Sequence, residues 1–126
     1  MAGNRYAAAA QFRAELRRFL RDSETCAREE GLTPQQYVVL LQIAGSDDGT
    51  ATVSDLVERL ALTQSTVTEL VQRAEHAGLV SRTPAPHDAR VVHLRATPDG
   101  ERRLARVHRR LGAERTRLRA VMDSLD

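Results

Sequence analysis

Residues 52–83 decide the fold and read TVSDLVERLALTQSTVTELVQRAEHAGLVSRT. This stretch holds two apolar patterns of helical period, each opened by a capping threonine, Thr52 and Thr63. Only a short connection, residues 61–63, separates the two patterns, and Gly78, a residue type that commonly ends helices, follows the second. Two short helices on so tight a connection predict a helix-turn-helix.

A β-hairpin is expected directly after this pair of helices. Residues 79–83 and 91–95 have the composition of strands, and residues 84–89 between them are rich in turn formers. The tip of this hairpin is expected to be exposed. The fold class predicted from these elements is mainly α with a small β-hairpin wing, a winged helix-turn-helix.

Two further helices are predicted upstream. Thr33, Pro34 and Gln36 supply an N-cap, a first-turn proline and a capping-box glutamine for one of them. Its expected buried face consists of Tyr37, Leu40, Leu41 and Ala44. The other covers residues 5–28, carries one apolar stripe on an otherwise charged surface, and ends at Gly31.

A final helix opens at Thr97 and Pro98 and carries a near-heptad apolar seam. Unbroken, this helix of about 28 residues would be about 42 Å long, too long to be buried within so small a domain. We therefore expect it to pack on the first helix and on a symmetry mate. The alternative is that Gly112 splits it into two helices. The seam consists of Leu104, Val107, Leu111, Leu118, Val121, Met122 and Leu125.

The length of 126 residues predicts one domain that buries a modest core, so oligomerisation is expected. We place the winged lobe at about residues 33–97 and the dimerisation helices at about residues 5–30 and 98–126 of a single domain, 1–126. All 19 basic residues are arginine and the net charge is +2. Arginine suits bidentate contacts with phosphate or guanine, although a GC-rich genome explains the same bias.

The composition argues against several classes of protein. Aromatic residues make up 3%, too few for the stacking surfaces that bind single-stranded nucleic acid. The single cysteine, Cys26, allows no disulfide framework, and the four histidines show no paired ligand spacing, so no metal or cofactor is expected. No phosphate loop or nucleophile motif is present, so an enzyme is not expected. The sequence has no signal peptide or apolar span, which predicts a cytoplasmic protein without membrane partners.

Five motifs occur in a characteristic order along the chain, in residues 32–40, 62–68, 78–82, 88–90 and 94–100. They read LTPQQYVVL, LTQSTVT, GLVSR, DAR and LRATPDG. In this order and spacing the chain resembles the MarR family of multiple-antibiotic-resistance-type regulators. The resemblance covers about residues 32–111, and the first helix matches more loosely.

The resemblance implies a homodimer whose first and last helices interlock and whose two winged lobes lie one DNA turn apart. It also implies a double-stranded, pseudo-palindromic DNA partner, a repressor function, and often a small aromatic or phenolic effector that releases the DNA. The family usually continues into one more dimerising helix, whereas this sequence stops at Asp126.

The helix that opens at Thr63 is the candidate DNA-reading helix. Its first turns are expected to present short hydrogen-bonding side chains and a favourable dipole end to a major groove. These candidate DNA-binding residues are Gln64, Ser65, Thr66 and Thr68. Arg73, further along, either reaches the DNA backbone or pairs with Glu69 one turn earlier.

The wing supplies the remaining candidates. Asp88 and Arg90 stand two apart, so they share one face of an extended segment, and the carboxylate can hold the guanidinium in place. An arginine positioned at a hairpin tip suits insertion into a narrow minor groove. Arg82 and Arg95 flank the hairpin and are candidates for phosphate contacts. The alternative for Asp88 and Arg90 is a solvent-exposed ion pair that only shapes a turn, and the alternative for Arg82 and Arg95 is that they are ordinary strand-surface arginines.

Three further interpretations remain open from the sequence. Cys26 invites a redox-sensing hypothesis, but neighbouring acidic residues would raise the pKa of its thiol, so a structural role is favoured. An effector pocket would lie near Tyr37 and Phe19, where the first, second and last helices meet. Winged helices also serve as protein-interaction modules, so a module without specific DNA binding is the competing function.

Overall fold

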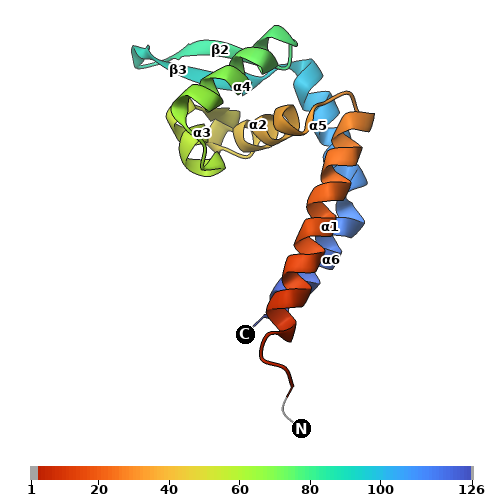
Figure 1. The fold of residues 1–126 in the computed structure, drawn as a ribbon. Helices are drawn as coiled ribbons and strands as arrows, with labels where there is room; N and C mark the ends of the chain where they lie inside the picture. Colours follow the sequence, from red (N-terminus) through yellow and green to blue (C-terminus); the bar gives the residue numbers. More distant parts are fainter. Residues whose placement is uncertain (1–2, 126) are drawn as a thin grey trace.

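The computed structural model describes residues 3–125, so the predicted domain limits at 1 and 126 lie outside the described residues. Its helices are α1 (Ala7–Glu29), α2 (Pro34–Ala44), α3 (Val53–Leu60), α4 (Gln64–His76), α5 (Pro98–Arg110) and α6 (Gly112–Asp123). A 3₁₀ turn, η1 (Asp47–Gly49), and the strands β1 (Thr50–Ala51), β2 (Val80–Ala85) and β3 (Asp88–Ala96) complete the fold. Figure 1 shows a lobe formed by α2, α3, α4 and the sheet, from which a stalk of α1 and α6 extends.

The starts of α2, α3 and α4 are fixed by side-chain caps, as predicted. Thr33 Oγ1 accepts a hydrogen bond from the Gln36 amide at 3.1 Å, and the Gln36 side chain accepts one from the Thr33 amide at 3.0 Å. Thr52 and Asp55 form the same reciprocal box at the start of α3. The Thr63 side chain accepts from the Thr66 amide at the start of α4. These local bonds satisfy amides that have no partner inside the helix.

The Asp55 cap predicts a pH-dependent contribution to stability. The hydrogen bond from the Thr52 amide lowers the pKa of the Asp55 carboxyl, so the folded state favours the carboxylate. A depressed pKa stabilises the fold above the unfolded value of about 4, and this stabilisation is lost as pH falls through the lower folded value. Urea unfolding should therefore show that Asp55→Asn is less stable than the parent at pH 7 and that the gap narrows towards pH 3. A gap that stays constant with pH would contradict this role of the charge.

The wing is a longer hairpin than the sequence predicted, and the sheet has a third strand. The strand order is β1-β3-β2, all antiparallel. β1 pairs Thr50 with Arg95 and Ala51 with Leu94, and two residues are too short for an alternating pattern to reveal a strand. β2 continues through Pro84, which was expected in the turn. Because β2 is an edge strand, where proline is tolerated, the ladder extends to a bulge next to Pro84.

The core lies around α2, which contacts α1, α3, α4, α5 and the sheet. Tyr37 and Leu40 are buried as predicted, but Leu41 is 36% exposed, so its assignment to the core was wrong. Val39 and Ile43, which the prediction omitted, are fully buried. A helix enclosed on several sides does not show the single apolar face on which the prediction relied.

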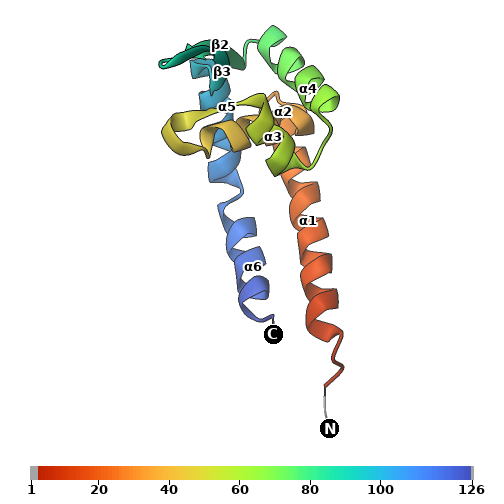
Figure 2. The ribbon, with the colours of Figure 1, turned by 90° about the vertical axis from the view of Figure 1, so that its left-hand side faces the viewer.

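The stalk pairs α1 with α6 side by side and antiparallel: α1 runs towards the lobe and α6 away from it, so the start of α1 and the end of α6 lie at the same end of the stalk (Figures 1 and 2). The prediction of one continuous last helix was wrong, and the alternative with a break at Gly112 is what the structure shows. Arg115 donates a hydrogen bond to the His108 carbonyl at 2.6 Å and so partners a carbonyl at the break. Leu104, Val107, Leu111 and Val121 of the seam are buried, whereas Met122 and Leu125 are exposed.

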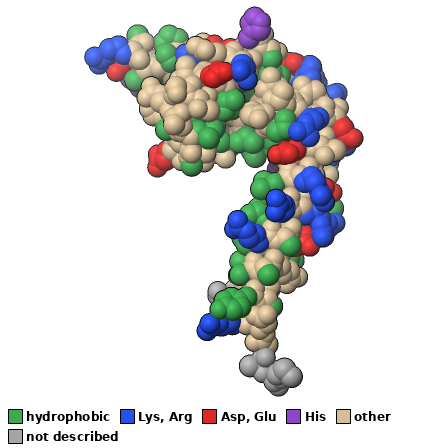
Figure 3. Space-filling model, in the orientation of Figure 1, with side chains coloured by type: hydrophobic (Ala, Val, Ile, Leu, Met, Phe, Trp, Pro, Cys, Tyr) green, Lys and Arg blue, Asp and Glu red, His purple; other side chains and the backbone are tan. Residues whose placement is uncertain are grey.

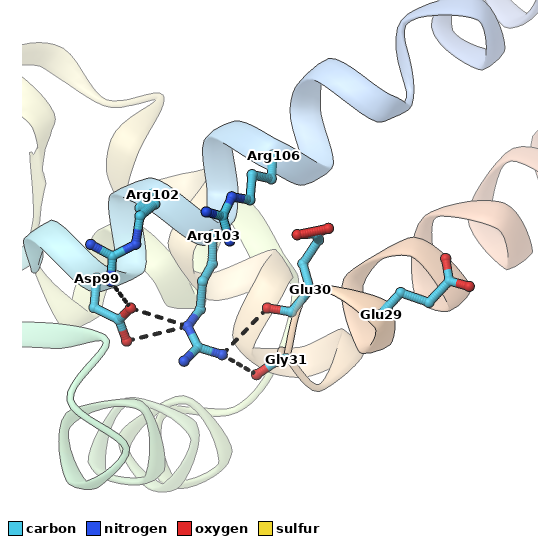
Figure 4. Close-up of a pocket in the computed structure, with 7 residues that line it drawn as sticks. All are labelled: Glu29, Glu30, Gly31, Asp99, Arg102, Arg103 and Arg106. Carbon is cyan, nitrogen blue, oxygen red and sulfur yellow. Dashed lines mark hydrogen bonds and ion pairs between the residues drawn. The ribbon is translucent and has the colours of Figure 1, made fainter.

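The end of α1 is joined to α5 by arginine side chains. Figure 4 shows Arg103 reaching from α5 to the carbonyls of Glu30 and Gly31, at 3.3 and 3.2 Å. Asp99 accepts from the same guanidinium, and Arg110 forms ion pairs with Glu29 and Glu30. These bonds cap the carbonyl end of α1 and fix the lobe to the stalk.

Candidate nucleic-acid interface

The first turn of α4 presents polar side chains to solvent. Gln64, Ser65 and Thr66 are exposed, while Val67, in the same turn, is fully buried and holds the helix on the core. Thr68 is half-buried, so its side chain is less exposed than the sequence predicted. Figure 1 places α4 on the side of the lobe away from the stalk, with the hairpin beside it. An exposed helix start with short hydrogen-bonding groups can meet phosphates and base edges.

Arg73 lies further along α4 and is paired within the helix. Its guanidinium contacts Glu69 Oε1 at 2.6 Å, and the two side chains are 70% and 61% exposed. The alternative of an ion pair one turn apart is therefore the arrangement seen. Such an exposed pair contributes little to stability, so the guanidinium is available to a stronger anion.

Arg90 stands at the end of the wing and is held by Asp88. The Asp88 carboxylate accepts from the Arg90 amide at 3.0 Å and from its Nε at 3.1 Å, while 91% of the Arg90 side chain remains exposed. These hydrogen bonds lower the pKa of the Asp88 carboxyl. The predicted shared face of the two residues is confirmed. Figure 3 shows a basic side chain with an acidic one beside it at the far end of the hairpin.

Arg82 and Arg95 occupy different places on the hairpin. Arg82 Nε contacts Glu75 Oε1 of α4 at 2.6 Å, a bond that the sequence analysis missed. The only feature of the sequence that points to this bond is that Glu75 lies near the end of the helix that precedes the strand. Arg95 is exposed near the base of β3, opposite both Thr50 and Ser81. Arg73 and Arg82 thus form ion pairs with glutamates of α4, whereas Arg90 lies near the tip of the hairpin.

The lobe as a whole is not basic. Residues 33–97 contain five arginines against seven acidic residues, a net charge of −2 with neutral histidines. An attraction for polyanions must therefore come from where the few positive groups lie, at the start of α4 and at the end of the wing.

The other candidate groups lie away from this surface. Cys26 is 5% exposed, and burial raises the pKa of its thiol, with Arg110 acting in the opposite direction. A buried, protonated thiol reacts slowly, in agreement with the favoured structural role. Tyr37 is buried, and a groove beside α2 is lined instead by Pro34, Val38 and Leu62 together with neighbouring residues. An effector pocket near Tyr37 stays a prediction.

Residues 3–125 contain neither a metal-binding cluster nor a membrane-spanning helix. No three His, Cys, Asp or Glu side chains in that range lie close enough to hold a metal ion. No helix in the same range combines the length and apolarity needed to cross a bilayer.

Comparison with known proteins finds similar chains among transcription regulators. The MarR family model matches residues 30–91. The transcriptional repressor MdtR of Bacillus subtilis is 34% identical over 73 residues, which are 58% of this chain and 46% of MdtR. The chain spans about half the length of the curated relatives it matches.

Solved structures show the same fold over most of the chain. A transcriptional regulator from Thermotoga maritima superposes with a TM-score of 0.69 at 28% identity, covering 94% of this chain and 80% of that one. A mutant MarR from E. coli complexed with operator DNA gives a TM-score of 0.69 at 22% identity, covering 87% of this chain and 78% of that one. The family match, the curated relative and the shared winged-helix fold together show that the chain belongs to the MarR family.

Proposed function

We propose that the chain is a sequence-specific DNA-binding transcription regulator that acts as a homodimer. The observation that carries this proposal is the pairing of two features on the side of the lobe away from the stalk: the open first turn of α4 and the Asp88-held Arg90 at the wing tip. The name of MdtR as a repressor supports repression, and the operator complex of E. coli MarR supports a double-stranded DNA partner.

The two features suit two grooves of one duplex. Gln64, Ser65 and Thr66 would contact base edges in a major groove, and Thr68 would add a contact at its margin. Arg90 would enter the neighbouring minor groove, where the potential is most negative. Arg73 would turn from Glu69 to a backbone phosphate, since phosphate is the stronger partner for an exposed guanidinium.

Dimerisation through the stalk would place two such lobes on one DNA molecule. Large apolar side chains remain exposed on the stalk helices, among them Leu20 at 52% and Met122 at 51%. Apolar side chains that are so exposed favour burial against a second copy of the chain. The family resemblance adds a small aromatic or phenolic effector and a cytoplasmic location to this proposal.

The competing function is a protein-interaction module, and one observation favours it. The lobe carries a net charge of −2, which is unusual for a surface that meets a polyanion. Such a module would hold another protein against α4 and the wing and would show no preference among DNA sequences.

Selection from a random pool of duplexes against the purified protein separates the two functions. The regulator should enrich a two-fold-related motif with half-sites about one turn apart, bound by a protein whose mass in solution is that of a dimer. Enrichment of no motif, by a protein that is folded and dimeric, would contradict the regulator and favour the interaction module.

A further inference from the structure

Arg82 lies on the face of the hairpin that turns towards the helices. It is two residues from Val80 on β2 and directly opposite Leu94 on β3, and both of these residues are buried. Alternate residues of a strand, and residues directly opposite on paired strands, point to the same face of a sheet. The strand geometry therefore directs the Arg82 side chain towards α4.

The ion pair between Arg82 and Glu75 is more shielded than the others of the interface. The two side chains are 38% and 28% exposed, against 70% and 61% for Arg73 and Glu69. Partial burial reduces screening by salt, and the Nε–Oε1 distance of 2.6 Å is that of a charge-assisted hydrogen bond. The pair is thus suited to hold two elements in a fixed arrangement.

The position of this ion pair allows it to fix the orientation of the hairpin relative to α4. At the base, Thr97 Oγ1 donates to the Gly78 carbonyl at 2.6 Å, and β1 holds β3 at Arg95 and Leu94. β2 forms one edge of the sheet and pairs with β3 alone. Of the side-chain hydrogen bonds and ion pairs made by residues 80–92 within the described chain, the bond from Arg82 to Glu75 is the one that leaves the hairpin.

We propose that Arg82 is a positioning residue: its ion pair with Glu75 sets the angle of the wing to α4 and so the place of Arg90 in the groove. The Arg82 guanidinium therefore does not contact a phosphate. The inference rests on the proposed DNA binding for its effect on affinity, but its effect on the wing is independent of DNA.

Glu75→Gln separates positioning from phosphate contact by the sign of its effect. If Arg82 contacted phosphate, removing the carboxylate would free the guanidinium, take a negative charge from the interface and tighten binding. Positioning instead predicts weaker binding to the selected duplex, on the order of tenfold, because the Arg90 contact is misplaced. Glu69→Gln is the matched control, since it makes the same charge change on the same helix. It should bind as tightly as the parent or more tightly.

Three additional variants test whether Arg82 acts through Arg90. In an Arg90→Ala background, Glu75→Gln and Arg82→Gln should each change affinity only by the small, screened effect of the charge removed, because the contact that they place is already absent. The exchange of charges in Arg82→Glu with Glu75→Arg should restore the affinity lost in the single variants. The proposal would be overturned if the losses of affinity in the combined variants were additive. It would also be overturned if the charge-exchanged protein had the melting temperature of the parent but did not regain its affinity.

A measurement on the free protein keeps the inference separate from the proposed function. Spin labels at Ala89 and Gln72, both exposed, report the distance from the wing to α4 in a Cys26→Ser background. We expect a single narrow distance distribution in the parent and in Glu69→Gln, and a broad or shifted one in Glu75→Gln. An unchanged distribution in Glu75→Gln would overturn the positioning role even if the protein binds DNA. A broadened one in a protein that selects no duplex would uphold the wing geometry and reject only the DNA-binding proposal.

Discussion

Replacing Arg90 with alanine is expected to weaken binding to the selected duplex by about 1–3 kcal/mol, roughly 5- to 150-fold. The guanidinium is 91% exposed at the end of the wing and is held in place by two bonds to the Asp88 carboxylate. Its orientation is therefore set before DNA arrives, which reduces the entropy lost on binding. Fluorescence anisotropy at fixed salt measures the affinity, and circular dichroism checks the fold.

Arg109→Ala is the matched control for this substitution. Arg109 is exposed on α5, away from the wing, and its loss changes the net charge by the same amount. The control should retain most of the affinity, because a distant surface charge acts only through screened, long-range attraction. If both variants lose affinity equally, or if a folded Arg90→Ala protein binds like the parent, the wing has no specific contact with DNA.

Replacing Gly100 with alanine is expected to lower the free energy of unfolding by about 1–3 kcal/mol. A Cβ at this position would overlap the Leu79 carbonyl oxygen and lie 3.0 Å from Leu40 Cδ2. The carbonyl belongs to the backbone at the start of the wing and accepts a hydrogen bond from the Thr97 amide, so it cannot move freely. The first turn of α5 and the base of the hairpin would have to separate.

Gly112→Ala provides the control for the general effect of alanine in a helix. At Gly112 the nearest atom to an added Cβ is the flexible end of Arg115, at 3.9 Å, so the side chain has room. Alanine there should stabilise the helix by up to about 1 kcal/mol through its higher helix propensity. Unfolding in guanidinium chloride measures the free energy of unfolding of both variants. A Gly100→Ala protein as stable as the parent would show that α5 and the Leu79 carbonyl do not approach as closely as the structure indicates.

The parts of the fold that were predictable are those that local sequence encodes. Thr33, Thr52 and Thr63 cap the helices that they were predicted to cap, because capping depends on residues only three apart. The helix-turn-helix and the hairpin follow from such local signals.

The errors at β1 and Leu41 involve contacts made at long range. β1 exists only because β3 lies beside it, and which residues of α2 are buried, Leu41 not among them, depends on how several elements pack around that helix. The break at Gly112 was left as an alternative, since helix propensity alone does not decide between a kink and a continuous helix.

The candidate interface was predictable in outline, and its arginine pairs were not. The exposed turn of α4 and the shared face of Asp88 and Arg90 follow from periodicity. The partner of Arg82 does not, because it depends on the turn at Gly78 bringing β2 back along α4. Which of the candidate residues contact DNA stays a prediction, and for Arg82 we propose a positioning role instead.

Sequence-specific DNA binding is tested by comparing the affinity for the selected duplex with that for a scrambled duplex of equal length at about 50 and 200 mM salt. We expect both affinities to fall steeply with salt while the selected duplex is bound at least about 10³-fold more tightly at the higher concentration. Equal affinity for the two duplexes, or binding that is indifferent to salt, would contradict this expectation.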